Sequence, residues 1–241
     1  MPRRALVIGC NYAGSSCELR GCHCDANAIA EHLTKLQYEV VLLLDDETHI
    51  KPTREHMIAE LHKLATWTHV VRGGEVFIHY SGHGSQTVDL SGDETDGLDE
   101  VLVPCDFNKP GSGLISDDWL WQMLSSMNRD CRIFALFDCC HSGSAMDIPS
   151  KHSSGGPTVF LMSGCKDSQT SADAFAVDGV REWSGALTSA LLHCLHNEDA
   201  AVCNNADLLL TAVRKFVSKG GFDQIPQLTR TCDSADIDFF F

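Results

Sequence analysis

Short apolar runs alternate with longer amphipathic stretches along most of the chain. The apolar runs are rich in Val, Ile, Leu and Phe, as buried strands are, whereas the amphipathic stretches repeat apolar residues at helical spacing. This alternation predicts an α/β fold with a mostly parallel central sheet and helices on both of its faces. Strands are expected at 4–9, 39–44, 75–80, 101–103, 132–137 and 158–163, and helices at 25–36, 53–66, 117–127, 184–196 and 204–218.

Two of the expected strands end in loops that carry reactive side chains. The run 75–80 breaks into SGHG around His83, and the run 132–137 breaks into DCCHSG around Cys139 and Cys140. Because neighbouring parallel strands end at the same edge of a sheet, we expect both loops to open into one crevice. An imidazole there can take the proton of a thiol, and the resulting thiolate is a far better nucleophile. The pattern therefore predicts nucleophilic cysteine catalysis.

Several cysteines and histidines compete for these two roles. Strand alternation sends Cys139 and Cys140 to opposite faces, so only one of them can face the crevice. His79 lies inside its strand as an expected core imidazole, and His141 points away from the crevice. His83 lies between two glycines, where a substrate backbone can approach closely, so it is the preferred base. A phosphatase loop of the Cys-x5-Arg type is excluded because position 146 is methionine.

Composition narrows the class of protein. With 241 residues, 44% hydrophobic and 21% charged, the chain suits one large globular α/β domain. A net charge of −15 argues against nucleic acid as a partner and is compatible with a basic peptide substrate. No apolar stretch has membrane-spanning length, and the apolar run 5–8 is too short for a secretory signal. Many of the 12 cysteines lie within apolar runs, so we expect free thiols in the reducing cytoplasm.

Carboxylates crowd the loops on the crevice side of the expected sheet. Such density repels itself unless a hard cation neutralises it, and oxygen ligands favour Ca²⁺; a solvated acidic loop is the alternative. A zinc site is disfavoured, because Cys22-x-Cys24 is not a zinc-knuckle spacing and no second C-x2-C pair completes it. The acidic residues are Asp89, Asp93, Glu94, Asp96, Asp99, Glu100, Asp117, Asp118 and Asp147, and the zinc candidates are Cys10, Cys17, Cys22, His23 and Cys24.

The motifs YSGHG at 80–84 and DCCHSG at 138–143 resemble the His and Cys motifs of metacaspases, the caspase-like cysteine peptidases of plants, fungi, protists and algae. The resemblance implies a caspase-like fold and a single peptidase domain over 1–241. Within it, 1–148 is large-subunit-like, 149–157 is a short linker and 158–241 is small-subunit-like, with no Pro-rich extension of the kind found in type I members with prodomains. The resemblance continues in family order through NYAG at 11–14, LRGC at 19–22 with Asp25-Ala26, SGCKD at 163–167, QTSAD at 169–173, GALT at 185–188 and a closing strand at 227–229.

The resemblance also implies roles for single residues. Cys140 takes the place of the family's nucleophile and His83 that of its general base, and we expect the backbone N–H groups of Gly84 and Cys140 to receive the oxyanion. The implied activity is calcium-activated cleavage after Arg or Lys in protein or peptide substrates, by a monomer. The implied S1-pocket residues are Cys22, Asp25, Ser81 and Asp138; the implied Ca²⁺ ligands are Asp117, Asp118 and Asp147 with Asp99, or Asp96 in its place; Lys151 is the candidate self-cleavage site.

Three alternatives stay open at this point. Asp25 could instead cap a helix, because it opens the expected helix 25–36. The chain could be a catalytically silent regulatory protein with a caspase fold, against which the presence of both His83 and Cys140 argues. It could also be a calcium-binding module whose dyad is vestigial.

Overall fold

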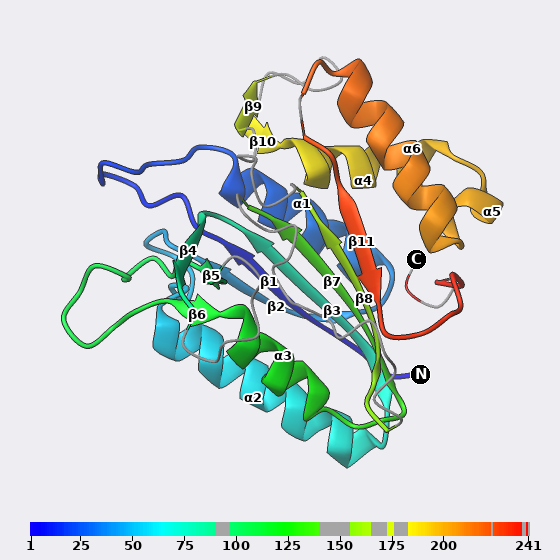
Figure 1. Ribbon diagram of the computed structural model, residues 1–241, viewed down its shortest axis with the longest axis horizontal. Coiled ribbons are helices and arrows are strands. Elements are labelled where there is room, and N and C mark those ends of the chain that lie inside the picture. Colours follow the sequence, from blue (N-terminus) through cyan, green and yellow to red (C-terminus); the bar gives the residue numbers. More distant parts are fainter. Residues whose placement is uncertain are drawn as a thin grey trace.

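A computed structural model of the chain describes residues 1–89, 97–139, 155–164, 173–175, 183–222, 224–237 and 240. Its centre is a six-stranded sheet with the order β11-β8-β7-β3-β1-β2 (Figure 1). Five strands run parallel and only β11, at one edge, is antiparallel, which confirms the predicted mostly parallel sheet. The strands are β1 (Arg3–Gly9), β2 (Glu39–Leu44), β3 (Gly74–Ser81), β7 (Cys131–Asp138), β8 (Thr158–Ser163) and β11 (Gln227–Arg230).

Helices cover both faces of this sheet (Figure 1). Alternation along β1 sends Leu6 and Ile8 into the core beneath one helical layer, and Ala5 and Val7 into the core beneath the other. Both sets are buried, as expected for a parallel strand covered on both sides. One layer contains α2 (Arg54–Val71) and α3 (Asp117–Ser125); the other contains α1 (Cys22–Lys35), α4 (Ala186–Asn197) and α6 (Ala206–Lys219), with the short α5 (Ala200–Cys203) next to α6.

Two small sheets differ from the sequence prediction. Residues 101 and 102 of the expected strand 101–103 lie in β5, which belongs to a separate antiparallel sheet rather than to the central one. This sheet follows β3 directly, so it lies at the carboxyl end of the central strands (Figure 1). It contains β4 (Gly84–Val88), β5 (Leu98–Leu102) and β6 (Ile115–Ser116), and a two-stranded ribbon contains β9 (Asp173–Phe175) and β10 (Trp183–Gly185).

Some helix boundaries also differ. The helix α1 begins at Cys22 rather than at Asp25, with Gly21 at its N-cap. The helix α2 runs on to Val71, past the expected end at 66, and stops where Arg72 adopts a left-handed conformation with φ 56°. Within the described parts of the chain, no helix combines the length and apolar character needed to cross a bilayer.

Candidate active site

The two reactive loops leave neighbouring strands at the same level. β3 and β7 are parallel neighbours, and Ser81 is the register partner of Asp138. His83 follows Ser81 by two residues, and Cys140 follows Asp138 by two residues. The expected convergence at one sheet edge therefore holds for the strands that carry the loops. Cys140, Asp147 and Lys151 themselves lie outside the described residues.

The adjacent thiol of Cys139 points into the protein core. It is 1% exposed and packs in the cluster beneath α2 and α3, together with Phe137. These two residues share a face because side chains two apart in a strand point the same way. Cys139 is therefore a structural residue in this arrangement, with no access to a substrate.

A backbone carbonyl orients the imidazole of His83. The Nε2 atom lies 2.7 Å from the carbonyl oxygen of Cys17, and the side chain is half-buried. A carbonyl oxygen can only accept a hydrogen bond, so Nε2 carries a proton, and in the neutral ring Nδ1 is then the nitrogen that can accept one. The ring is thus held in the tautomer of a base. The sequence carries no signal that would identify Cys17 as this partner, because every residue has a backbone carbonyl.

Three of the expected pocket residues meet next to this loop. The Ser81 hydroxyl donates to Oδ2 of Asp25 at 2.7 Å, and Ser81 is also the register partner of Asp138. Asp25, Ser81 and Asp138 are 2%, 1% and 4% exposed, so two carboxylates are buried within one small region. A buried carboxylate needs strong hydrogen bonds or a cation, which makes this region a candidate for binding a basic group.

The N-terminus of α4 donates hydrogen bonds to both carboxylates. The N–H of Gly185, the N-cap residue, lies 2.8 and 2.9 Å from the two oxygens of Asp25. The N–H of Thr188 donates to Oδ2 of Asp138 at 2.8 Å. A Cβ atom at position 185 would overlap the Asp138 carboxylate and lie 2.8 Å from Oδ2 of Asp25, so the close approach requires glycine. Helix N-termini favour negative charge, and here one helix stabilises the pair.

The alternative role for Asp25 as a helix N-cap is wrong. Because α1 begins at Cys22, Asp25 lies inside its first turn and is buried, and its side chain reaches Gly185 instead of capping its own helix. Cys22 lies one helical turn before Asp25, is 5% exposed, and donates its N–H to Oδ1 of Asn11 at 3.0 Å. The structure thus brings Asp25, Ser81 and Asp138 into direct contact with one another or with α4, and leaves Cys22 at their border.

His79 is a buried structural imidazole, as expected from its place inside β3. It is fully buried, and its Nε2 atom lies 3.3 Å from the hydroxyl oxygen of Thr188, the residue that also holds Asp138. Burial lowers the pKa of His79 to about 3. The neutral ring therefore links the centre of β3 to the N-terminus of α4.

This buried histidine predicts a loss of stability in acid. Between the ordinary pKa of 6.5 and the folded value of about 3, the unfolded chain binds a proton that the folded chain excludes. The free energy of unfolding should therefore rise with pH across this window and fall as acid is added. We expect His79→Gln to flatten that dependence in urea unfolding followed at several pH values. The exposed His62→Gln should keep the wild-type slope, and an unchanged slope in His79→Gln would contradict the assignment.

Acidic residues gather near the start of α3, but they do not complete a metal site by themselves. Burial, helped by the charges of Glu100, Asp118 and Asp99, raises the pKa of Asp117 to about 7, against a hydrogen bond from the Asp118 N–H that lowers it. Asp99 and Asp117 are buried. Among the residues that the structure describes, no group of three or more His, Cys, Asp or Glu side chains could hold a metal ion. The expected ligand Asp147 and its substitute Asp96 lie outside that part of the chain.

The disfavoured zinc cluster also has another explanation. His23 contacts Oδ1 of Asp45 at 2.5 Å, and Cys10 and Cys22 are buried cysteines that form no disulfide. Burial raises the pKa of the Cys10 thiol well above its usual value, which disfavours the thiolate that a metal would need. Cys10, Cys22 and His23 therefore serve the packing around the turn after β1.

Comparisons with known proteins agree with this architecture. A profile of the family described as "Metacaspase, peptidase C14 domain" matches residues 3–149. "Metacaspase-1" of Pyricularia oryzae is 42% identical over 164 residues, which cover 64% of this chain and 40% of that protein. "Metacaspase-2" of Trypanosoma brucei brucei is 33% identical over 273 residues, which cover 99% of this chain and 75% of that protein. A crystal structure of a protein from Geobacter sulfurreducens has a TM-score of 0.71 at 24% identity and covers 95% of this chain and 93% of its own.

The parallel sheet, with reactive loops and buried carboxylates at its carboxyl edge, defines a caspase-like α/β domain. The chain belongs to the metacaspase family of peptidases. It spans about two fifths of the length of the Metacaspase-1 proteins from Pyricularia oryzae and Saccharomyces cerevisiae, at 40% and 36%.

Proposed function

We propose that this chain is a cysteine endopeptidase that cleaves after Arg or Lys and is activated by Ca²⁺. The observation that carries the proposal is the common level of the two loops on β3 and β7, beside a buried pair of carboxylates. The base is His83, whose Nε2 atom is held by the Cys17 carbonyl, and the nucleophile is Cys140. Each of them follows one member of the register pair Ser81 and Asp138 by two residues in the sequence. Asp25 and Asp138 supply negative charge for a basic side chain.

The proposed mechanism uses this chain's own groups. Nδ1 of His83 takes the proton from the Cys140 thiol, and the thiolate attacks the carbonyl carbon of the scissile peptide bond. The N–H groups of Gly84 and Cys140 receive the negative charge that develops on the carbonyl oxygen. The protonated His83 then gives its proton to the departing amine, which leaves the acyl group on sulfur. A water molecule loses a proton to His83 and attacks the thioester carbon; the C–S bond then breaks, which releases the carboxylic acid product, and His83 returns the proton to the sulfur of Cys140.

Recognition of the basic side chain follows from charge in a site that excludes water. Asp25 and Asp138 are almost fully buried and are oriented by N–H groups of α4 rather than by one another. A guanidinium or ammonium group entering there would form charge-assisted hydrogen bonds. An acidic side chain would meet two carboxylates, so cleavage after Asp is disfavoured by like-charge repulsion.

Peptide cleavage tests the proposal directly. Fluorogenic peptides with Arg, Lys, Asp or Leu at P1, assayed with and without Ca²⁺, should show turnover of the Arg and Lys peptides only, and more of it with Ca²⁺. Efficient cleavage after Asp would refute the specificity. A chain that binds Ca²⁺ but cleaves no peptide would instead favour the alternative of a catalytically silent regulatory or calcium-binding protein.

The calcium proposal rests on the chemistry of the donor set. Asp99, Asp117 and Asp118 are hard oxygen donors, and the raised pKa of Asp117 reflects burial together with repulsion from its neighbours. A bound Ca²⁺ would neutralise this repulsion. The ligands that the resemblance implies are Asp117, Asp118 and Asp99 with Asp147, which follows Cys140 by seven residues; the three described residues do not form a metal site by themselves. The ion supplies charge neutralisation only, and the reaction steps above do not pass through it.

Replacing both aspartates at the start of α3 should abolish the calcium response. We expect Asp117→Ala/Asp118→Ala to lose Ca²⁺ binding in calorimetry and to lose the increase of peptidase rate with Ca²⁺, because two of four ligands are gone. Glu55→Ala is the matched control, since Glu55 is an exposed acid in the first turn of α2. Full wild-type activity in excess chelator would rule out calcium activation.

A further inference from the structure

The backbone of His83 is held on both sides by two buried tyrosines. The His83 N–H donates to the hydroxyl oxygen of Tyr12 at 3.0 Å. The hydroxyl of Tyr80 donates to the His83 carbonyl oxygen at 2.7 Å. Tyr12 and Tyr80 are 4% and 0% exposed, and their hydroxyl oxygens are 3.0 Å apart. The backbone N–H and the backbone carbonyl of His83 are therefore both hydrogen-bonded to this pair of tyrosine hydroxyls.

The remaining hydrogen bonds of this pair connect it to Val103, just after β5. The Tyr12 hydroxyl donates to the Val103 carbonyl at 2.6 Å, and the Val103 N–H donates to the Tyr80 hydroxyl at 3.2 Å. The Tyr80 hydroxyl also lies 3.0 Å from the Val103 carbonyl, a longer contact than its 2.7 Å bond to the His83 carbonyl. Gly82 is needed for this arrangement, because a Cβ there would lie 2.7 Å from the Tyr80 oxygen and 3.0 Å from the Tyr12 oxygen. This explains the first glycine of the SGHG loop.

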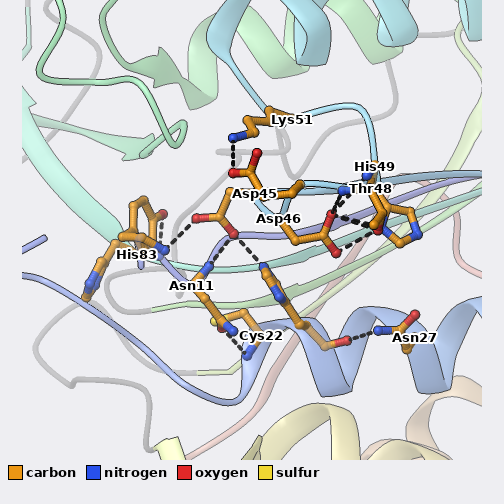
Figure 2. A network of polar contacts seen from close by, with 12 residues as sticks. Asn11, Cys22, Asn27, Asp45, Asp46, Thr48, His49, Lys51 and His83 are labelled. Atoms are coloured by element: carbon orange, nitrogen blue, oxygen red, sulfur yellow. Dashed lines mark hydrogen bonds and ion pairs between the residues drawn. The ribbon is translucent and has the colours of Figure 1, made fainter. Parts of the chain in front are cut away.

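Tyr12 reaches this position through an unusual backbone conformation that Asp45 stabilises. Its φ is 51°, in the left-handed region that non-glycine residues rarely adopt. The consecutive N–H groups of Asn11 and Tyr12 both donate to the Asp45 carboxylate, at 2.8 and 2.6 Å (Figure 2). Successive N–H groups that converge on one anion are the favourable geometry of such a turn.

Asp45 is suited to this role because it stays ionised. Burial alone would raise its pKa, but hydrogen bonds from His23, Asn11 and Tyr12 together hold the pKa below its usual value. The carboxylate therefore keeps its charge and both of its backbone bonds at neutral pH. His23 approaches it from α1, so the turn after β1 is tied to the helix that carries Asp25 (Figure 2).

The Tyr12 ring also packs against the imidazole. The two ring centroids are 4.8 Å apart with an interplanar angle of 36°. The imidazole therefore packs against the Tyr12 ring, and its Nε2 atom contacts the Cys17 carbonyl. The backbone of the same residue is held by the Tyr12 hydroxyl. Among the described residues, the hydrogen bond of this ring is made by Nε2 and not by Nδ1.

We propose that Asp45 and Tyr12 are positioning residues for His83: Asp45 fixes the turn at Tyr12, and Tyr12 holds the His83 backbone and ring so that Nε2 stays on the Cys17 carbonyl. This inference rests on the proposed function, because it assigns how the base of that reaction is oriented. The role proposed for both residues is to orient His83 and not to bind the substrate. Their effect is on the geometry of proton transfer and should therefore appear in kcat rather than in KM.

The chain contains three tyrosines, which provides a matched control. Tyr12→Phe keeps the ring and removes the hydroxyl that accepts from His83. We expect kcat for an Arg peptide to fall about tenfold with KM unchanged, because one hydrogen bond is worth about that factor. Tyr38→Phe removes another buried hydroxyl, one that bonds Phe240 on the opposite face of the sheet, and should leave both constants at their wild-type values.

A second pair of variants tests the anchor. Asp45→Asn removes the charge that holds the 11–12 turn and should also lower kcat. Asp46→Asn is its control, because Asp46 accepts the N–H groups of Thr48 and His49 in the next turn, whereas Asp45 accepts that of Tyr12. Melting temperatures should be measured for all four variants. A lower kcat at an unchanged melting temperature indicates that the orientation of His83 is altered and not that the protein is unfolded.

The ring nitrogens of His83 provide a readout that does not need turnover. In ¹⁵N NMR, with the His83 signals assigned by their absence in His83→Gln, the wild type should show a protonated Nε2 and a bare Nδ1. Tyr12→Phe should shift this signal toward a mixture of tautomers, and Tyr38→Phe should not. An unchanged His83 signal in Tyr12→Phe overturns the proposal, whether or not kcat falls. If the wild type cleaves no peptide, the proposed function is wrong and the NMR comparison alone decides whether Tyr12 positions His83.

Discussion

Cys140→Ala should reduce turnover of Arg peptides by at least about 10⁴-fold, because it removes the sulfur that forms the acyl-enzyme. Cys139→Ala should retain most of the wild-type rate. The two residues are adjacent, yet Cys139 packs with Phe137 in the core beneath α2 and α3 and is 1% exposed. The side chain at 139 therefore contributes packing, and its loss should cost about 1 kcal/mol of stability rather than activity.

The comparison of these neighbours controls for disturbance of the strand end. Both variants shorten a side chain at the end of β7, so a general loosening of that end would slow both enzymes equally. Steady-state rates and urea midpoints should be measured for the two proteins together. Retained turnover in Cys140→Ala would contradict its assignment as the nucleophile. Loss of turnover in Cys139→Ala without a change of urea midpoint would assign that role to Cys139 instead.

Asp138→Asn should remove most cleavage after Arg and Lys. The amide oxygen of Asn can still accept the Thr188 N–H, so the shape of the pocket is kept while its charge is reduced. Loss of one partner from a buried, hydrogen-bonded charge pair costs about 2–5 kcal/mol, or roughly 30- to 4,000-fold in kcat/KM. No cleavage after Asp should appear, because the substitution adds no cation to the pocket.

Asp130→Asn is the control for this experiment. Asp130 lies just before β7, at the opposite end of the strand from Asp138, and its side chain is 69% exposed. It should have wild-type kcat/KM for Arg, Lys and Asp peptides. Unchanged cleavage after Arg in Asp138→Asn would show that the carboxylate does not recognise the P1 side chain.

The central sheet could be predicted from the sequence because its strands are continuous apolar runs. Strands β2 and β8 begin and end where the pattern placed them. The small sheet could not be placed, because β5 contains Asp99 and Glu100, which resemble loop residues although both are buried. Burial of charge there depends on neighbours distant in the sequence, and local periodicity carries no information about them.

The candidate site, like the fold, could be predicted from the sequence only in part. The types and order of His83, Asp25 and Asp138 are visible in the sequence, whereas most of the groups that orient them belong to the backbone. The Cys17 carbonyl and the Gly185 N–H have no side-chain signature, because every non-proline residue carries the same groups. The Tyr12 hydroxyl is a side-chain group, but its role depends on a left-handed turn that requires Asp45, which lies 33 residues away.

If Asp25 and Asp138 select the substrate as proposed, the hydrogen bonds from α4 make that selection depend on both halves of the chain. The match to the family profile ends at residue 149, yet Gly185 and Thr188, which bind the two buried carboxylates, come after it. A fragment ending there would retain Asp25 and Asp138 but leave them without these donors. If the backbone were cut between 149 and 157, the two pieces would still be joined by the ladder between β7 and β8. Specificity for Arg and Lys would then require both pieces. It would be lost when they are separated and regained when they are recombined.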